Sequence, residues 1–264
     1  MTTIVCLHAH PDDESISTGG VMLKAVADGH RVVLVTATRG ECGEVSEGFL
    51  APGETLGERR TAETLASADA LGLHRVEFLG YRDSGMIGEP ANDDPACFWQ
   101  ADVEDAATKL AALLVEEAAD LLTVYDDFGG YGHPDHIQVH RVGLRAAEIA
   151  GIDRVFEATM NQDAIRESIK AARASGELDG ADMPDENETD TFGKPESLIT
   201  HAVDVSAFTA QKRASMRCHA SQINDDSFFM KMPDEMFAQA FGTEWFIEHG
   251  VPRAAHEPFS ATLM

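Results

Sequence analysis

The stretch TIVCLHAHPDDE (residues 3–14) joins the two patterns that decide the fold. Its first half is a nearly continuous run of apolar and β-branched residues, and its second half is a polar turn rich in carboxylates. Three further apolar runs follow, namely RVVLVTAT (31–38), RVEFLGY (75–81) and LLTVYD (121–126). Strands that are buried on both faces of a parallel sheet have this composition. The four runs therefore predict four parallel strands.

Helical patterns lie between these runs. Between residues 102 and 118, apolar residues recur at intervals of three and four and so share one stripe of a helix. The stretch from about Gly57 to Leu71 behaves similarly and stops at Gly72, a residue suited to a helix C-cap. Strands that alternate with helices over short connections predict an α/β fold of the Rossmann-like, doubly wound type, with a mostly parallel sheet and helices on both faces.

The pattern weakens after about residue 150. It predicts four further elements, which are a strand at 154–160, a helix at 161–174, a strand at 198–205 and a helix at 207–220. The stretch 176–196 has eight acidic residues and one basic residue, which indicates a mobile surface loop. The last forty residues are rich in Phe and Met, which is typical of core packing. Without an internal repeat, we interpret residues 1–264 as a single domain, with a motif-bearing core (1–150) and a variable C-terminal part (151–264).

Composition excludes several classes of partner. The chain has 264 residues, with 46 acidic and 20 basic side chains and a net charge of −26. Such an excess argues against binding to nucleic-acid phosphates or to anionic membranes, since both need clustered Lys and Arg. No apolar run is long enough to span a membrane, and the N-terminus lacks the features of a signal peptide. The four cysteines are scattered, so we expect no disulfide and a cytoplasmic protein.

Polar residues collect where the predicted strands end. The four strands run into His10–Glu14, Thr38–Glu41, Tyr81–Ser84 and Asp126–His136. In an open parallel sheet, ligands bind in the crevice beyond the carboxyl ends of the strands. Because almost all of the unusual polar chemistry falls at this one edge, we expect a catalytic site there.

The types of side chain at this edge indicate a metal ion. Imidazole together with carboxylate suits Zn²⁺, with Fe²⁺ as the alternative, and a catalytic zinc typically keeps three protein ligands and one position for water. His10 and Asp13, three residues apart on a turn, can converge on one ion, and His136 from another loop can complete the set. Such a metal lowers the pKa of its bound water to about 7.

Three neighbouring residues are candidates for the remaining catalytic roles. Asp12 adjoins a predicted ligand without being needed as one, so it is the candidate general base. His133, protonated, could stabilise the oxyanion or protonate the leaving amine. The phenol of Tyr131 could donate a hydrogen bond to the same oxygen.

At these residues the chain resembles the PIG-L/LmbE-type zinc-dependent N-acetylglucosaminyl deacetylases, which include the mycothiol-pathway deacetylase and amidase. The resemblance spans roughly residues 3–150. It rests on five blocks in the family's order, which are AHPDDE (9–14), TRGE (38–41), RTAE (60–63), GYRDSG (80–85) and GYGHPDH (130–136).

The resemblance implies the same site. It implies a zinc ion on the three predicted ligands, the same three catalytic residues, and sugar contacts by Arg60 and Asp83. In the family, the C-terminal part usually shapes the pocket for the aglycone. We therefore expect a metal-dependent hydrolase that removes the N-acetyl group from a small N-acetylglucosamine-containing conjugate. We expect no nucleic-acid or membrane partner, and the sequence leaves a homo-oligomer open.

Three other functions remain as alternatives. One is an amidase that acts on a bulkier amide, such as a mycothiol S-conjugate. A metal-dependent phosphoesterase also places His and Asp at strand ends, but two-metal phosphatases usually need more bridging carboxylates. The third is a non-catalytic sugar-binding protein, which would normally have lost Asp12 or His133.

Other polar residues near the motifs have simpler interpretations. We expect His8 to be a buried, hydrogen-bonded core residue and His140 to serve packing or the surface. Glu14 either orients a ligand or favours a helix N-terminus. Arg82 either contacts the substrate or pairs with a neighbouring acid. Cys6 is expected to be a small buried side chain.

Overall fold

The computed structural model describes residues 1–175 and 192–264. The predicted acidic loop at 176–196 therefore lies, up to residue 191, outside the described residues. None of the helices within the described ranges combines the length and the apolar character that a bilayer span requires.

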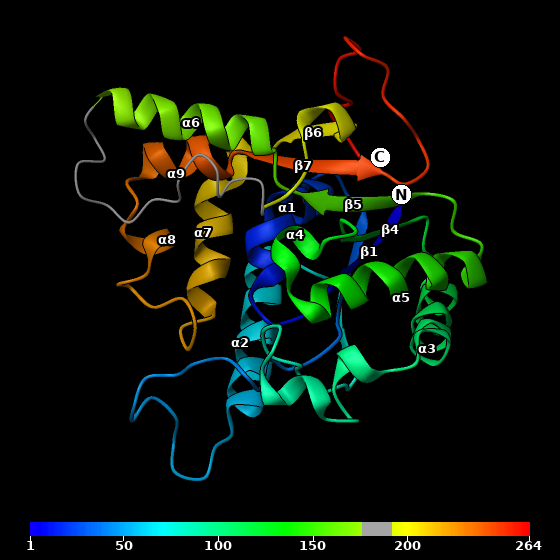
Figure 1. Cartoon of the computed structure of the whole chain (residues 1–264), viewed down its shortest axis with the longest axis vertical. Helices are drawn as coiled ribbons and strands as arrows, with labels where there is room; N and C mark the ends of the chain where they lie inside the picture. Colours follow the sequence, from blue (N-terminus) through cyan, green and yellow to red (C-terminus); the bar gives the residue numbers. More distant parts are fainter. Residues whose placement is uncertain (176–191) are drawn as a thin grey trace.

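Within the described residues, seven strands form one mixed sheet with the order β3-β2-β1-β4-β5-β7-β6 (Figure 1). The strands are β1 (Thr3–His8), β2 (Arg31–Thr36), β3 (Arg75–Phe78), β4 (Leu121–Tyr125), β5 (Val155–Thr159), β6 (His201–Asp204) and β7 (Thr243–Glu248). The first five are parallel, whereas β7 is antiparallel to both β5 and β6. The predicted mostly parallel α/β sheet is confirmed.

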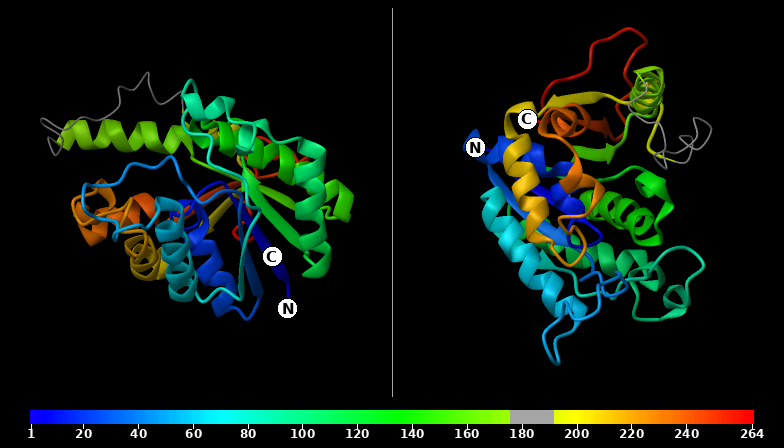
Figure 2. Two further views of the ribbon diagram at one scale, coloured as in Figure 1. Left: turned by 90° about the horizontal axis from the view of Figure 1, so that it is seen from below. Right: turned by 90° about the vertical axis from the view of Figure 1, so that its left-hand side faces the viewer.

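Helices cover both faces of this sheet (Figure 2). The longer ones are α1 (Gly19–Ala27), α2 (Leu56–Leu71), α3 (Val103–Glu116), α5 (Pro134–Ala150), α6 (Gln162–Ser175), α7 (Thr209–Cys218) and α9 (Asp234–Phe241), and the short ones are α4 (Gly129–Gly132) and α8 (Phe228–Lys231). A π-helical turn spans Glu14–Thr18, and short 3₁₀ turns span Pro90–Asp93, Phe98–Gln100, Glu196–Leu198 and Ser206–Phe208. As predicted, α2 ends at Gly72, whose φ of 73° suits a glycine C-cap.

Strand β1 shows why its sequence is apolar throughout. Val5 and Leu7 point into the core that α3 and α5 cover, whereas Ile4 and Cys6 point into the core that α1 covers. All four are essentially inaccessible to solvent. Alternate side chains of one strand therefore fill two separate cores, which requires apolar residues at consecutive positions.

The order of the strands fixes the position of the site. From β1 the chain proceeds to β2 and β3 on one side, and from β4 it proceeds to β5 on the other side. Since β1 and β4 are parallel neighbours whose connections lead to opposite sides of the sheet, they form a switch point, and ligands of open α/β sheets bind in the crevice beyond such a point. The segments that follow these two strands contain the predicted ligands His10, Asp13 and His136.

Two details differ from the prediction. Strand β3 was expected over 75–81 with burial on both faces, but it covers Arg75–Phe78 and is only half-buried. Among the described strands it pairs with β2 alone, so it lies at the edge of the sheet. The sequence also gave no sign of β7, because the inward-facing Glu244 interrupts its apolar pattern.

Glu244 is a buried carboxylate that caps the start of α1. It accepts hydrogen bonds from the backbone N–H groups of Gly20 (2.7 Å) and Val21 (2.8 Å) and from Lys212 Nζ (2.6 Å). Gly20 must be a glycine because a Cβ there would lie 2.5 Å from Val205. The C-terminal part of the chain is thereby joined to the helix that follows the first motif.

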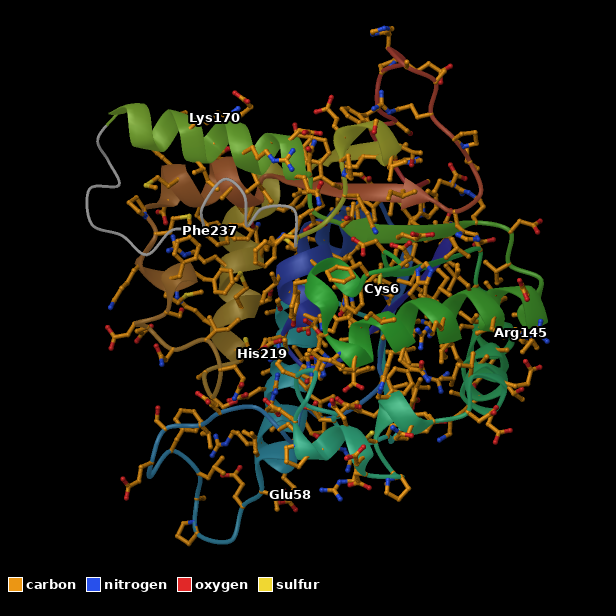
Figure 3. The ribbon with its side chains drawn as sticks, viewed as in Figure 1. Cys6, Glu58, Arg145, Lys170, His219 and Phe237 are labelled. Atoms are coloured by element: carbon orange, nitrogen blue, oxygen red, sulfur yellow. The ribbon has the colours of Figure 1, made fainter. Side chains whose placement is uncertain are left out.

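We predict that Glu244→Ala lowers the free energy of unfolding by about 3–5 kcal/mol, because it leaves the ammonium of Lys212 buried without a partner. Urea unfolding measures the change. Arg145→Ala is the control. Arg145 pairs with Glu104 and Glu148 at the solvent-exposed end of α5 (Figure 3), and its loss should cost far less. Equal losses for the two variants would contradict the assignment.

Candidate active site

The three predicted metal ligands meet at the crevice between β1 and β4. His10 Nδ1, Asp13 Oδ2 and His136 Nε2 form a triangle whose three sides each measure 3.3 Å. We call these three atoms the ligand triangle. All three residues are buried. His10 and Asp13 belong to the turn after β1, and the backbone N–H of His10 donates to Asp13 Oδ2 at 2.9 Å, which fixes the carboxylate.

Hydrogen bonds behind the rings determine which ring nitrogens carry protons. His10 Nε2 donates to Asp135 Oδ2 at 3.2 Å, and His136 Nδ1 donates to the carbonyl oxygen of Gly129 at 3.1 Å. The opposite nitrogens of both rings then direct lone pairs into the ligand triangle, next to a carboxylate oxygen. Three acceptor atoms that face one another in this way attract a cation.

The pKa shifts of His10 and Asp13 also indicate that positive charge is favoured here. Burial disfavours charge on His10, but the carboxylates of Asp13, Asp135 and Asp83 outweigh burial and raise its pKa well above the ordinary value. Burial likewise disfavours charge on Asp13, but His136 and His10 hold its pKa well below the ordinary value. The surroundings of His10 and Asp13 therefore favour positive charge at this point.

The ligand triangle also has the dimensions of a zinc site. Tetrahedral ligands at about 2.0–2.1 Å from a zinc ion lie roughly 3.3–3.4 Å from one another. Besides the ligand triangle, two other groups of described residues have potential ligand atoms within 4.8 Å of one another: His10 with His133 and His136, and His10 with Asp83 and Asp135. In the second group His10 Nε2 is already a hydrogen-bond donor, so the ligand triangle is the better site.

Asp12 is held in an unusual backbone conformation next to the ligand triangle. Its φ is +96°, which a residue with a side chain adopts at a cost of about 1–3 kcal/mol. Its backbone N–H donates to Glu14 Oε2 at 2.9 Å, and Arg60 Nη2 lies 3.2 Å from its Oδ2 atom. Burial raises the pKa of Asp12 to about 6, and Arg60 acts in the opposite direction. The carboxylate remains partly accessible, with 17% of the side chain exposed.

His133 forms the N-cap of α5. Its Nδ1 accepts a hydrogen bond from the backbone N–H of Asp135 at 3.1 Å, so its proton resides on Nε2. Burial and the neighbouring rings of His10 and His136 lower its pKa to about 3. The N-cap bond and the lowered pKa favour the neutral ring in this structure, and the predicted protonated form during the reaction stays a prediction. A neutral His133 can still donate its Nε2–H to a developing oxyanion.

Tyr131 lies on the short α4, and its hydroxyl is 3.5 Å from His136 Nε2. Its side chain is accessible at the mouth of the site, since the residue is 41% exposed. This loop approaches α5 closely, because a Cβ on Gly129 would lie 2.5 Å from His136 Cβ. Gly129 also has a φ of 67°, so only glycine fits there without strain.

The structure places both predicted sugar contacts at the edge of the site. Arg60 is buried on α2, and its guanidinium donates to the carbonyl oxygens of Pro11 (2.5 Å) and Gly40 (2.9 Å). Asp83 is also buried and accepts hydrogen bonds from the backbone of Cys42 (3.1 Å) and Gly85 (2.8 Å). Their contacts with a sugar remain predictions.

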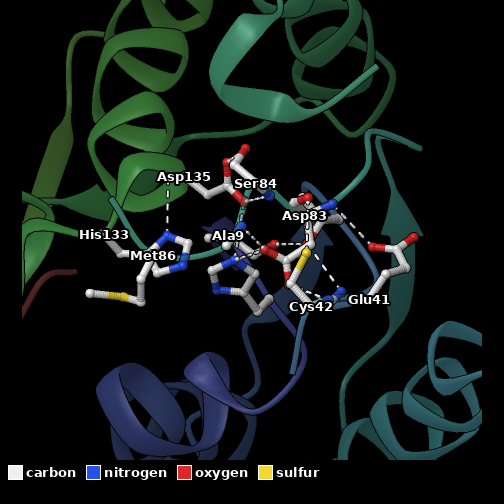
Figure 4. Close-up of polar contacts among 12 residues, drawn as sticks. Ala9, Glu41, Cys42, Asp83, Ser84, Met86, His133 and Asp135 are labelled. Carbon is white, nitrogen blue, oxygen red and sulfur yellow. Dashed lines mark hydrogen bonds and ion pairs between the residues drawn. The ribbon is translucent and has the colours of Figure 1, made fainter. Parts of the chain in front are cut away.

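Asp135 is the hydrogen-bond partner of the predicted ligand His10, and it was not singled out from the sequence. It is fully buried, and it accepts hydrogen bonds from the backbone N–H of Ser84 (2.9 Å) and from Ser84 Oγ (Figure 4). Its position between two histidines in HPDH was the available signal. Tyr125 was also missed, and its ring stacks on His136 with centroids 4.3 Å apart.

Most of the simpler interpretations are confirmed. His8 is buried between the hydroxyls of Tyr125 and Thr18, at 2.9 and 2.8 Å. His140 Nδ1 donates to the carbonyl oxygen of Tyr125 at 3.0 Å and takes no part in the ligand triangle. Arg82 pairs with Asp94 at 2.8 Å, and Cys6 is fully buried.

A doubly wound α/β sheet with a His/Asp group at its switch point defines a Rossmann-like protein with a site of metal-binding type. Residues 5–147 match the model of the PIG-L family, described as GlcNAc-PI de-N-acetylase. The chain belongs to this family, which confirms the resemblance seen in the sequence.

Relatives and solved structures agree with this assignment. The chain is 41% identical over 256 residues to a 1D-myo-inositol 2-acetamido-2-deoxy-α-D-glucopyranoside deacetylase from Acidothermus cellulolyticus, and the match covers 93% of this chain and 88% of the relative. Its fold resembles N,N′-diacetylchitobiose deacetylase from Pyrococcus horikoshii, with a TM-score of 0.62, 18% identity and coverage of 95% and 84%. It equally resembles the 4-carboxy-2-hydroxymuconate hydratase GalB from Pseudomonas putida KT2440, with a TM-score of 0.60, 16% identity and coverage of 98% and 100%. Likeness to solved structures at this level shows the fold alone.

We predict that Asp135→Asn weakens the binding of a divalent metal by about 10- to 100-fold, because the amide no longer orients His10 as a carboxylate does. Competition with a chelator of known affinity measures the change. Asp94→Asn, which removes only the exposed pair with Arg82, is the control and should leave the affinity unchanged. An unchanged affinity in Asp135→Asn would show that Asp135 does not support the ligand.

Proposed function

We propose that this chain is a zinc-dependent deacetylase that hydrolyses the acetamido group of an N-acetylglucosaminyl inositol, with Fe²⁺ as the alternative metal. The observation that supports the proposal most strongly is the ligand triangle, whose three acceptor atoms lie 3.3 Å apart beside an accessible carboxylate. The substrate class follows from the 41% identity to a deacetylase of that substrate over nearly the whole chain.

In this proposal His10, Asp13 and His136 hold the ion. When bound, the ion supplies Lewis acidity for the amide carbonyl and for the attacking water. Asp12 accepts a proton from the water as it attacks the carbonyl carbon. Neutral His133 donates its Nε2–H to the developing oxyanion, and the Tyr131 hydroxyl provides a second donor from the mouth of the site.

The same residues complete the reaction. The C–N bond breaks after Asp12 returns its proton to the amide nitrogen, so one water molecule and one acetamide give acetate and the free amine. Arg60 keeps Asp12 directed towards the centre through its contact at 3.2 Å. Arg60 and Asp83 are the proposed contacts for the sugar, and the C-terminal part borders the aglycone.

The related amidase reaction differs only in the acyl group that is removed. Acetate release from N-acetylglucosaminyl inositol, measured beside the cleavage of a mycothiol S-conjugate, separates the two activities. The relatives' deacetylase activity favours the first. The hydratase on the same fold shows that the fold alone does not decide between reactions.

Removal of the metal is expected to abolish acetate release, because the ligand triangle then lacks its Lewis acid. The metal content of the chelated protein should be checked by elemental analysis, and about one equivalent of Zn²⁺ or Fe²⁺ should restore turnover. Full activity in protein without metal would overturn the mechanism. A need for two ions per chain would instead favour the phosphoesterase alternative.

Asp12→Asn is expected to lower kcat by about 10²–10⁴-fold while the metal stays bound, since the amide cannot accept the proton. Asparagine has nearly the same shape and tolerates positive φ, so the backbone should be preserved. Steady-state kinetics and metal analysis on the same sample provide the test. Asp28→Asn, at the exposed end of α1, is the control. Unchanged turnover in Asp12→Asn would remove Asp12 as the base.

A further inference from the structure

A buried hydrogen-bond cluster lies directly behind Asp12. Glu14 is fully buried, and its Oε2 atom accepts the backbone N–H of Asp12 at 2.9 Å. Its Oε1 atom accepts hydrogen bonds from Ser67 Oγ and from His219 Nε2, both at 2.6 Å. One carboxylate thus connects the backbone of the proposed base to α2 and to the C-terminal part of the chain.

The His219 ring packs against the Glu14 carboxylate. His219 follows the last residue of α7, beside α2, and is completely buried (Figure 3). Its Nδ1 atom has no hydrogen-bond partner within the part of the chain that the structure describes. The next turn is anchored as well, because Glu63 of α2 accepts hydrogen bonds from Ser221 N (2.9 Å) and Ser221 Oγ (2.6 Å). Glu14 is therefore the partner that accounts for the position of the His219 ring.

The pairing has an electrostatic reason. An ionised carboxylate buried without a partner is strongly disfavoured, so Glu14 needs a compensating donor or charge. Burial disfavours the charged form of His219, but the neighbouring Glu14 carboxylate raises the pKa of His219 above its ordinary value. Without His219, Glu14 would lose its main positively charged partner and the hydrogen bond that holds its Oε1 atom in place.

The position of Glu14 matters because the Asp12 backbone is strained. At a φ of +96° the residue tends to relax unless its peptide groups are held. Its carbonyl accepts Ser15 N at 3.0 Å, and its N–H is held by Glu14. Both peptide groups are therefore fixed, and the direction of the Asp12 carboxylate follows from them.

We propose that His219 and Glu14 are positioning residues for Asp12, with His219 holding Glu14 and Glu14 holding the strained backbone of the base. This inference rests on the proposed function, in which Asp12 is the base. It assigns to the C-terminal part a role in the chemical step in addition to bordering the aglycone.

The test compares variants of His219 in the full-length, metal-loaded enzyme. His219→Leu removes the donor to Glu14 and should lower kcat by about 10- to 100-fold, with KM and metal content within about twofold of the wild type. His219→Gln keeps an N–H donor and should recover most of that loss. His201→Leu replaces another buried histidine, on β6, whose Nδ1 contacts Thr200 Oγ1, and should leave kcat unchanged.

A double-mutant cycle separates positioning from a general loss of stability. In an Asp12→Asn background, His219→Leu should cause no further fall in the residual rate, because there is no longer a base to position. If the two losses multiply, His219 acts independently of Asp12 and the inference is overturned. If His219→Leu does not fold, Ser67→Ala serves instead and should lower kcat in the same direction, and an unchanged kcat would overturn the inference.

The controls keep this inference separate from the proposed function. A wild-type enzyme that releases no acetate contradicts the proposed function itself. An active wild type together with an active His219→Leu variant contradicts the positioning role alone.

Discussion

The mutual approach of three acceptor atoms is the interaction on which the rest of the site depends. His10 Nδ1, Asp13 Oδ2 and His136 Nε2 lie 3.3 Å apart in a buried crevice, an arrangement that is unfavourable unless a positive charge joins them. The raised pKa of His10 reflects the same preference for positive charge. The strand order that makes β1 and β4 neighbours creates the arrangement, and hydrogen bonds to Asp135 and Gly129 keep the two rings in place.

The C-terminal part supports this centre through two buried carboxylates. Glu244 on β7 caps α1 and neutralises Lys212 on α7, so the last strand and α7 are fixed relative to the first motif. Glu14 then connects the residue after α7, His219, to the backbone of Asp12. The C-terminal part, which the family resemblance associates with the aglycone, is thus also connected to the backbone of the proposed base Asp12.

The features that could be predicted from the sequence are those that depend on short stretches of residues. The apolar runs of β1, β2 and β4 and the convergence of the predicted ligands His10, Asp13 and His136 could be predicted because periodicity and residue type are local properties. The support of these ligands was not found, since it depends on distant pairs: Asp135 lies 51 residues from Ser84, and Glu14 lies 205 residues from His219. The N-cap bond that favours a neutral His133 was not predicted either, because it depends on the local backbone geometry rather than on composition.

Anomalous diffraction at the zinc absorption edge, from crystals of the active enzyme, tests the central claim most directly. The account predicts one ion at about 2.0–2.2 Å from each of His10 Nδ1, Asp13 Oδ2 and His136 Nε2, with Asp12 beside it and not bound to it. An active enzyme whose ion is held instead by Asp83 and Asp135, or that has no ion at the ligand triangle, would contradict the account.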